Sequence, residues 1–210
     1  YNTEPEKNLN NRSISWPRGK TLGGSSSING MIYIRGQRQD YDSWAAQGNH
    51  GWSFDELLPY FIRNENNNDR SGPYHGNSGA QWVGDIAHEF EMSDTFIEAA
   101  IDSGIPLNND FNGPSQEGVG YFQAMIKNGR RQSSATDYLS LCKKRKNFNL
   151  ITNALTGKII VDNGEAIGVQ YQHRKQQIIA YCNHEVVLCG GAINSPQLLE
   201  LSGIGDSTRL

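Results

Sequence analysis

The chain has 210 residues, which suits one sizeable domain or two small ones and is long enough to bury a core. Its net charge of −3 and its scattered charged residues favour no nucleic-acid surface, and no apolar run of about 18 residues could span a membrane. The three cysteines lack C-x-x-C spacing, so the sequence indicates neither a disulfide framework nor a zinc site and favours a reducing compartment.

The first distinctive stretch is GKTLGGSSSINGM, residues 19–31. A phosphate loop of the G-x-x-x-x-G-K type would need glycine at the position of Ile14, so this interpretation fails. GVGYFQ at 118–123 fails as a dinucleotide loop because Gln123 stands at the third glycine position. A looser anion site remains, in which a preceding serine caps a helix that begins near Ile28, with a plain glycine-serine turn as the alternative.

Two helices are predicted next along the chain. DYDSWAAQG, residues 40–48, is typical of a short helix that a glycine closes. SFDELLPYFIRNEN, residues 53–66, opens with a capping box from Ser53 to Glu56 and places its apolar residues on one helical face. A break in this second helix is expected near Pro59.

A long loop is predicted over residues 64–85, which are rich in Asn, Gly, Ser, Asp and Pro. Loops of this length are usually lids or disordered segments. SDTFIEAAIDSG then predicts a helix with Ser93 or Asp94 at its start and Gly104 beyond its end.

Two short segments resemble metal sites but lack essential ligands. NNDFNG at 108–113 resembles a calcium loop, yet Val119 stands where the bidentate acid belongs. HEFEM at 88–92 lacks the second histidine of a zinc-protease helix. The sequence therefore predicts no metal site.

The C-terminal third changes to strands. Residues 157–189 predict three strands and a fourth, EVVLC at 185–189, and the first turn contains Asn163-Gly164, a strong hairpin signal. A helix follows the glycine pair 190–191, with Asn194 or Ser195 as its cap, Pro196 in its first turn and Gly203 as its terminator. This strand, glycine pair and helix form either a ligand phosphate or ribose contact or a plain connection.

The glycine-rich segments together resemble one family, the glucose-methanol-choline (GMC) oxidoreductases, which are flavin enzymes that oxidise alcohols. GKTLGGSSSINGMIYIRGQRQDYD at 19–42 is similar to the first signature of the family, and GAINSPQLLELSGIG at 191–205 is similar to the second. DFNG, GRRQSSATDYL and AIGVQY lie between them in the order usual for the family. The likeness covers nearly the whole chain and points most to the bacterial choline dehydrogenase-like branch.

The resemblance implies a mixed α/β fold (α+β), the central part of a GMC-type FAD-binding domain interleaved with substrate-domain and lid segments. Residues 1–63 would belong to the FAD-binding region, residues 64–130 to the lid and substrate domain, and residues 131–210 to the FAD-binding region with the three-stranded β-meander.

The resemblance also implies FAD as a non-covalent cofactor. The glycine-serine run would contact the diphosphate and ribityl chain, Asn29 would lie on the flavin side, and a backbone contact to adenine would fall on Thr156. Covalently tethered relatives carry a histidine where this chain has Ile28, which is not a nucleophile. The implied cofactor-binding residues are Gly23, Gly24, Ser25, Asn29, Gly30, Ile32, Thr156, Gly190, Gly191 and Ala192.

No catalytic residue is assigned, because the family places its dinucleotide loop upstream of Tyr1 and its catalytic histidine downstream of Leu210. The chain begins without methionine and stops just beyond a helix, so it is interpreted as a fragment that is inactive alone. The histidines present are predicted to be surface or loop residues: His50, His75, His88, His173 and His184.

The expected reaction of the parent enzyme is oxidation of the CH–OH group of a choline-like or other primary alcohol, by hydride transfer to flavin. Oxygen or a quinone would accept the electrons. A hydroxynitrile lyase on the same scaffold and an inactive truncated product are the alternatives. The expected location is cytoplasmic, with peripheral membrane association as the alternative.

Overall fold

The computed structural model describes residues 1–208 and residue 210, and it mixes helices with short strands. It divides into two compact units, Tyr1–Phe148 and Asn149–Leu210, each of which is described by itself. None of the helices in the described residues is long and apolar enough to cross a membrane.

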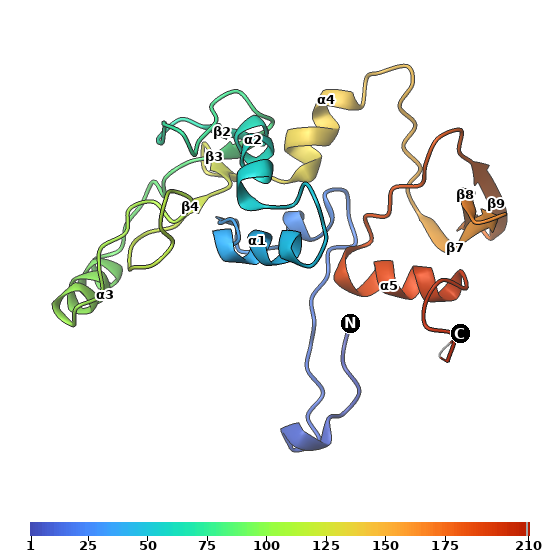
Figure 1. Cartoon of the computed structure of the whole chain (residues 1–210), viewed down its shortest axis with the longest axis horizontal. Helices are drawn as coiled ribbons and strands as arrows, with labels where there is room; N and C mark the ends of the chain where they lie inside the picture. Colours follow the sequence, from blue (N-terminus) through green and yellow to red (C-terminus); the bar gives the residue numbers. More distant parts are fainter. Residues whose placement is uncertain (209) are drawn as a thin grey trace. The chain divides into compact units, whose positions relative to one another are not determined.

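The first unit contains four α-helices, several short helical turns and three two-stranded sheets (Figure 1). Its strands pair as β1 with β4, β2 with β3, and β5 with β6. In chain order its elements are η1 Lys7–Leu9, η2 Gly24–Ser27, β1 Ile32–Tyr33, α1 Arg38–Ala46, α2 Phe54–Asn64, β2 Glu65–Asn67, β3 Gln81–Val83, α3 Glu91–Asp102, β4 Gln123–Ala124, β5 Ile126–Lys127, β6 Arg130–Arg131, the π-helix η3 Ala135–Leu139 and α4 Ser140–Cys142.

Helix α2 forms where the sequence predicts it. The side chains of Ser53 and Glu56 make the capping box, and each satisfies a backbone N–H of the first turn. The expected break at Pro59 is wrong, since α2 runs through this residue. Proline lacks one N–H donor, and a helix of this length with an apolar face tolerates the single missing hydrogen bond.

Helices α1 and α3 each begin two residues before the predicted start. Helix α1 starts at Arg38 because Gln37 and Asp40 form an additional capping box. Helix α3 starts at Glu91, whose carboxylate suits the positive end of the helix dipole. Both ends are confirmed, since Gly48 and Gly104 follow them with φ of +97° and +95°.

The predicted loop over residues 64–85 is wrong in part, because it contains the parallel pair β2–β3. Glu65 and Val83 have no exposed surface, and Asn67 is 1% exposed. Two glycines pass close to α2 and β2: a Cβ at Gly76 would lie 1.8 Å from the Ile62 carbonyl oxygen. The glycines that predict a loop here instead allow the backbone to pack closely against α2 and β2.

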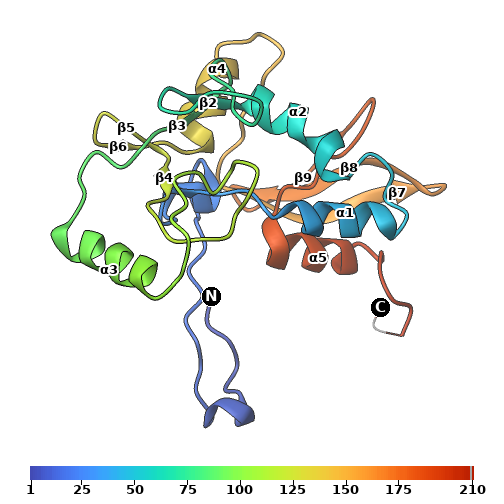
Figure 2. The same cartoon turned by 60° about the vertical axis from the view of Figure 1, so that its left-hand side comes forward.

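The second unit is an antiparallel sheet of three strands, β7 Ala154–Asp162, β8 Glu165–His173 and β9 Gln176–Tyr181, with helix α5 packed on β7 (Figure 2). The predicted hairpin is confirmed, because Asn163 and Gly164 have φ of +48° and +84°, as a type I′ turn requires. The Ile159 N–H donates to Ser202 Oγ at 2.8 Å and joins β7 to the end of α5.

Two predictions for the last segment are wrong. Residues 185–189 form no strand, because apolar composition alone supplies no neighbouring strand for the backbone hydrogen bonds. Helix α5, Gly191–Leu201, begins before the predicted caps, with Gly190 at its N-cap and Pro196 inside it. Gly191 adopts φ of +83°, which lets the chain turn directly into the helix.

Candidate cofactor site

The glycine-serine stretch of the first unit forms a tight 3₁₀ turn, η2, with Gly23 and Gly24 at φ of +86° and +55°. The expected helix from Ile28 is wrong. Ser26 Oγ donates to the Gly23 carbonyl and Ser27 Oγ donates to the Leu22 carbonyl, so both serines close the turn upon itself and cap no helix.

The turn is compact because the chain approaches itself closely. A Cβ at Gly19 would lie 2.1 Å from the Gly24 carbonyl oxygen, and the Gly19 N–H donates to Ser25 Oγ at 3.2 Å. Only glycine fits at position 19, since any side chain would displace the backbone on which the turn rests.

The segment before η3 supports the turn from the other side. A Cβ at Gly23 would lie 3.2 Å from the Ala135 nitrogen, and the Ser134 N–H donates to Ser26 Oγ at 3.0 Å. Arg131 donates from Nη1 to the Asn29 carbonyl oxygen at 2.7 Å. Sequence reasoning used the segment GRRQSSATDYL only for its order in the chain and missed this supporting role.

The other predicted cofactor residues lie in the second unit. Thr156 sits half-buried in β7 opposite Tyr171, and Gly190, Gly191 and Ala192 are exposed at the start of α5. Six of the predicted residues lie in one continuous stretch of the first unit, which runs from η2 to β1: Gly23, Gly24, Ser25, Asn29, Gly30 and Ile32.

A buried polar cluster that sequence reasoning missed lies beside these elements in the first unit. Glu65 forms an ion pair with Arg35, and its Oε1 lies 2.9 Å from His75 Nδ1. The other ring nitrogen of His75, Nε2, lies 2.8 Å from Asp110 Oδ2. His75 lies in the loop between β2 and β3, as predicted, but it is not at the surface, because its side chain is buried between two carboxylates. The carboxylates that contact His75 lie 10 and 35 residues away in the sequence, so no local pattern could have predicted the cluster.

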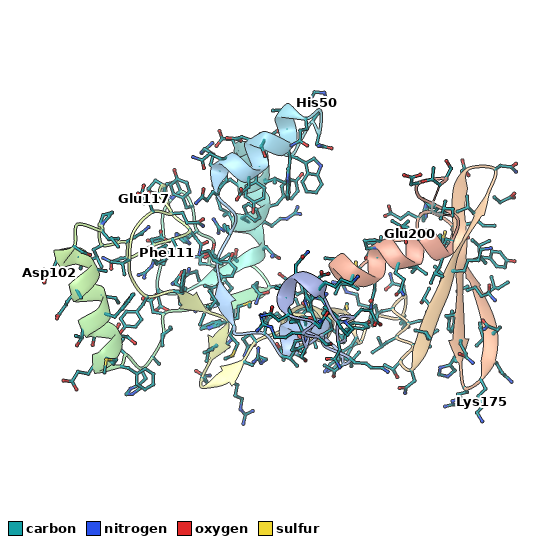
Figure 3. The ribbon with its side chains drawn as sticks, turned by 90° about the horizontal axis from the view of Figure 1, so that it is seen from below. His50, Asp102, Phe111, Glu117, Lys175 and Glu200 are labelled. Carbon is teal, nitrogen blue, oxygen red and sulfur yellow. The ribbon has the colours of Figure 1, made fainter. Side chains whose placement is uncertain are left out.

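The remaining histidines differ from His75. His50, His88 and His184 are exposed and His173 is half-buried. Figure 3 shows His50 beyond the end of α1, at the outer tip of its loop. His50, His88 and His184 agree with the surface or loop prediction, whereas His173 does not, because it is the last residue of strand β8 and is half-buried.

Comparison with known proteins identifies the family. Residues 6–210 match the family described as GMC oxidoreductase. The chain belongs to this family. The family recognition and the expected α/β fold are therefore confirmed.

Relatives of this GMC chain are alcohol-oxidising enzymes. It is 42% identical to an alcohol dehydrogenase [acceptor] of Pseudomonas putida and 40% identical to an oxygen-dependent choline dehydrogenase of Brucella anthropi. The mitochondrial choline dehydrogenase of Homo sapiens is 40% identical. Each comparison covers 100% of the chain, and 39%, 38% and 35% of the respective relative.

Solved GMC structures superpose closely on it. Pyridoxine 4-oxidase from Mesorbium loti has a TM-score of 0.92 at 30% identity, over 99% of this chain and 41% of that chain. An FAD-dependent oxidoreductase from Chaetomium thermophilum has the same TM-score and identity, over 99% of this chain and 38% of that one. The comparisons thus also support the expected FAD cofactor.

The turn in the first unit of this GMC chain fits parts of FAD. In the described part of the chain, a Cβ placed on Gly24 or Gly30 would have no atom within 4 Å beyond its own chain neighbours, so space is open beside both backbones. Ile28 and Ile32 are 49% and 51% exposed and offer apolar surface for a flat ring. Bare backbone, a serine hydroxyl and an apolar edge match a ligand that joins a diphosphate to an aromatic ring system.

Opposing effects act on the pKa values of the buried cluster. Burial favours the neutral carboxyl of Glu65, but hydrogen bonds from His75 and Asn67 and the charge of Arg35 outweigh it and lower its pKa. Burial disfavours the imidazolium of His75, but hydrogen bonds to Glu65 and Asp110 outweigh it and raise its pKa. The cluster therefore favours a charged histidine between two carboxylates.

The pH dependence of stability follows from these directions. The raised pKa of His75 stabilises the fold below the ordinary histidine value of 6.5, and this contribution is lost as pH rises through the folded-state pKa. The lowered pKa of Glu65 stabilises the fold above its ordinary value of 4.5 and is lost as pH falls through the folded-state pKa. We expect the difference in melting temperature between the parent protein and His75→Gln to be greatest between these values. A difference that stays constant up to pH of about 9 would contradict the charged state of His75.

Proposed function

We propose that this chain supplies part of the FAD-binding surface of an enzyme that oxidises the CH–OH group of a choline-like or other primary alcohol. The observation that carries the proposal is the turn Gly23–Ser27. The open space beside Gly24, the serines and the adjoining isoleucines suit FAD, within a family match over residues 6–210. The chain spans about two fifths of the relatives that it matches, so activity is proposed for the protein that contains it.

Each part of the surface has a proposed role. FAD, when bound, supplies the hydride acceptor for alcohol oxidation. Gly23 and Gly24 let the backbone approach the diphosphate, Ser25 retains a hydroxyl proton to donate, and Asn29 and Ile32 face the flavin end. Thr156 would contact the adenine through its backbone. Residues 190–192 would line the cofactor side of the second signature.

The remaining assignments extend the same proposal. Residues 1–63 and 131–210 serve FAD, and residues 64–130 contribute to the lid and substrate domain. Oxygen or a quinone accepts the electrons, the location is cytoplasmic, and the 210 residues alone do not turn over alcohol. The names of the relatives, choline dehydrogenase and alcohol dehydrogenase [acceptor], support an alcohol substrate.

Anaerobic titration tests the proposed reaction. We expect the flavin absorbance of the purified gene product to bleach when choline or a short primary alcohol is added, because hydride transfer reduces the flavin. Bound flavin that never bleaches with alcohols but accompanies cleavage of a cyanohydrin would instead support the lyase. Absence of any bound flavin would contradict the proposal.

We also expect the flavin to be non-covalently bound. Ile28 stands where tethered relatives carry histidine, and its side chain offers no nucleophile. Acid precipitation of the gene product should release all FAD into the supernatant. Flavin fluorescence that stays with the denatured polypeptide would show that another side chain forms the bond.

A further inference from the structure

Arg131 connects the hairpin β5–β6 to the turn η2 and to Asn29, which follows it. It pairs with Ile126 in the hairpin, and its Nη1 donates to the Asn29 carbonyl oxygen at 2.7 Å and to Asn29 Oδ1 at 2.8 Å. A longer contact of 3.3 Å reaches the Ser26 carbonyl oxygen. One guanidinium nitrogen thus holds both the backbone and the side chain of Asn29.

The side chain of Asn29 has its acceptor capacity filled within the protein. Oδ1 accepts from Arg131 and also from the Met31 N–H at 3.1 Å, which together use both lone pairs. Met31 has φ of +63°, a conformation that this hydrogen bond helps to hold. Rotation of the amide would aim its NH₂ group at two donors, so these contacts fix its orientation.

The amide nitrogen of Asn29 is consequently the group that faces outward. Asn29 is exposed, and nothing in the described part of the chain hydrogen-bonds to its Nδ2. An amide held in this way can only donate. Neighbouring Ile28 and Ile32 supply the apolar surface on either side of it.

We propose that Arg131 is a positioning residue for the cofactor, because it orients the Asn29 amide as a hydrogen-bond donor toward an acceptor atom of the flavin ring. The inference rests on the proposed function, in which this turn binds FAD. Arg131 touches no part of FAD in this proposal and acts through Asn29 alone. The Asn29 amide held in this way would favour a hydrogen-bond acceptor of the flavin ring beside its Nδ2 and disfavour a donor there.

A double-mutant cycle on the gene product tests this role. FAD is removed and rebound, and its dissociation constant is measured for Arg131→Met, Asn29→Ala and the double variant. We expect Arg131→Met to weaken FAD binding by about tenfold, as loss of the oriented hydrogen bond from the Asn29 amide predicts, and to add less than about twofold in the Asn29→Ala background. Arg130→Met is the matched control, since the exposed Arg130 precedes Arg131 on β6 and, within the described residues and outside the strand pairing of the hairpin, hydrogen-bonds only through its backbone carbonyl, to Gln132.

Two further readouts separate positioning from folding. Arg131→Lys, which keeps a donor cation, should recover part of the affinity, and Asn29→Asp should weaken FAD binding although its carboxylate can still pair with Arg131. The flavin reduction potential should shift in Arg131→Met and stay at the parent value in Arg130→Met. If Arg131→Met does not fold, Asn29→Asp with a parent-like melting temperature carries the test.

The outcomes distinguish this inference from the proposed function. Equal loss of FAD affinity from Arg131→Met in both backgrounds, or parent-like affinity in Asn29→Asp, would overturn the positioning role while leaving FAD binding intact. A parent gene product that binds no FAD would overturn the proposed function itself.

Discussion

Substitution of Gly24 by valine should abolish FAD retention. Gly24 adopts φ of +55°, which a β-branched residue reaches only at a cost of about 1–2 kcal/mol or more. The new side chain would also project into the open space beside the turn, where the proposal places the diphosphate. Together these effects predict at least about tenfold weaker FAD binding, measured as the ratio of flavin absorbance to protein after desalting.

Gly48→Val is the matched control for this substitution. Gly48 follows helix α1 with φ of +97°, and a Cβ placed on it would likewise have no atom within 4 Å. The Gly48→Val variant should lose stability through the same backbone strain. Its ratio of flavin absorbance to protein should stay at the value of the parent protein. A yellow Gly24→Val protein with the parent stoichiometry would contradict the assignment of the turn to FAD.

Neutralisation of Glu65 should strongly destabilise the first unit. Glu65 is fully buried, and its carboxylate pairs with Arg35 and His75, so Glu65→Gln leaves two cationic groups in the interior without their shared counter-charge. Removal of one partner of a buried ion pair typically costs about 3–5 kcal/mol. We expect a fall in melting temperature of about 10 °C, measured by calorimetry of the gene product.

Asp55→Asn tests whether burial causes that effect. Asp55 Oδ2 lies 2.9 Å from Arg38 Nη1, but 75% of the Asp55 side chain is exposed. Exposed ion pairs contribute little to stability, so the melting temperature should hardly change. Similar losses in both variants would show that the Glu65 cluster is no stronger than a surface pair.

The sequence determined the elements whose signals are local. The capping box at Ser53 and Glu56, the hairpin turn at Asn163 and the glycines that end α1 and α3 each depend on residues a few positions apart. The order of the glycine-rich segments likewise sufficed to recognise the family, and residues 6–210 confirm it.

Only the tertiary structure decided the features that depend on distant partners. Arg35 and Glu65 are 30 residues apart, and Ser26 and Ser134 are 108 apart, so no periodic pattern joins them. Such contacts buried His75 and turned part of a polar, glycine-rich segment into a paired strand. They also bent the serines after Gly23 into a closed turn, because hydroxyl groups that satisfy backbone carbonyls nearby no longer cap a helix. The apolar segment 185–189 shows the converse, since it has the composition of a strand but no pairing partner and forms no regular secondary structure.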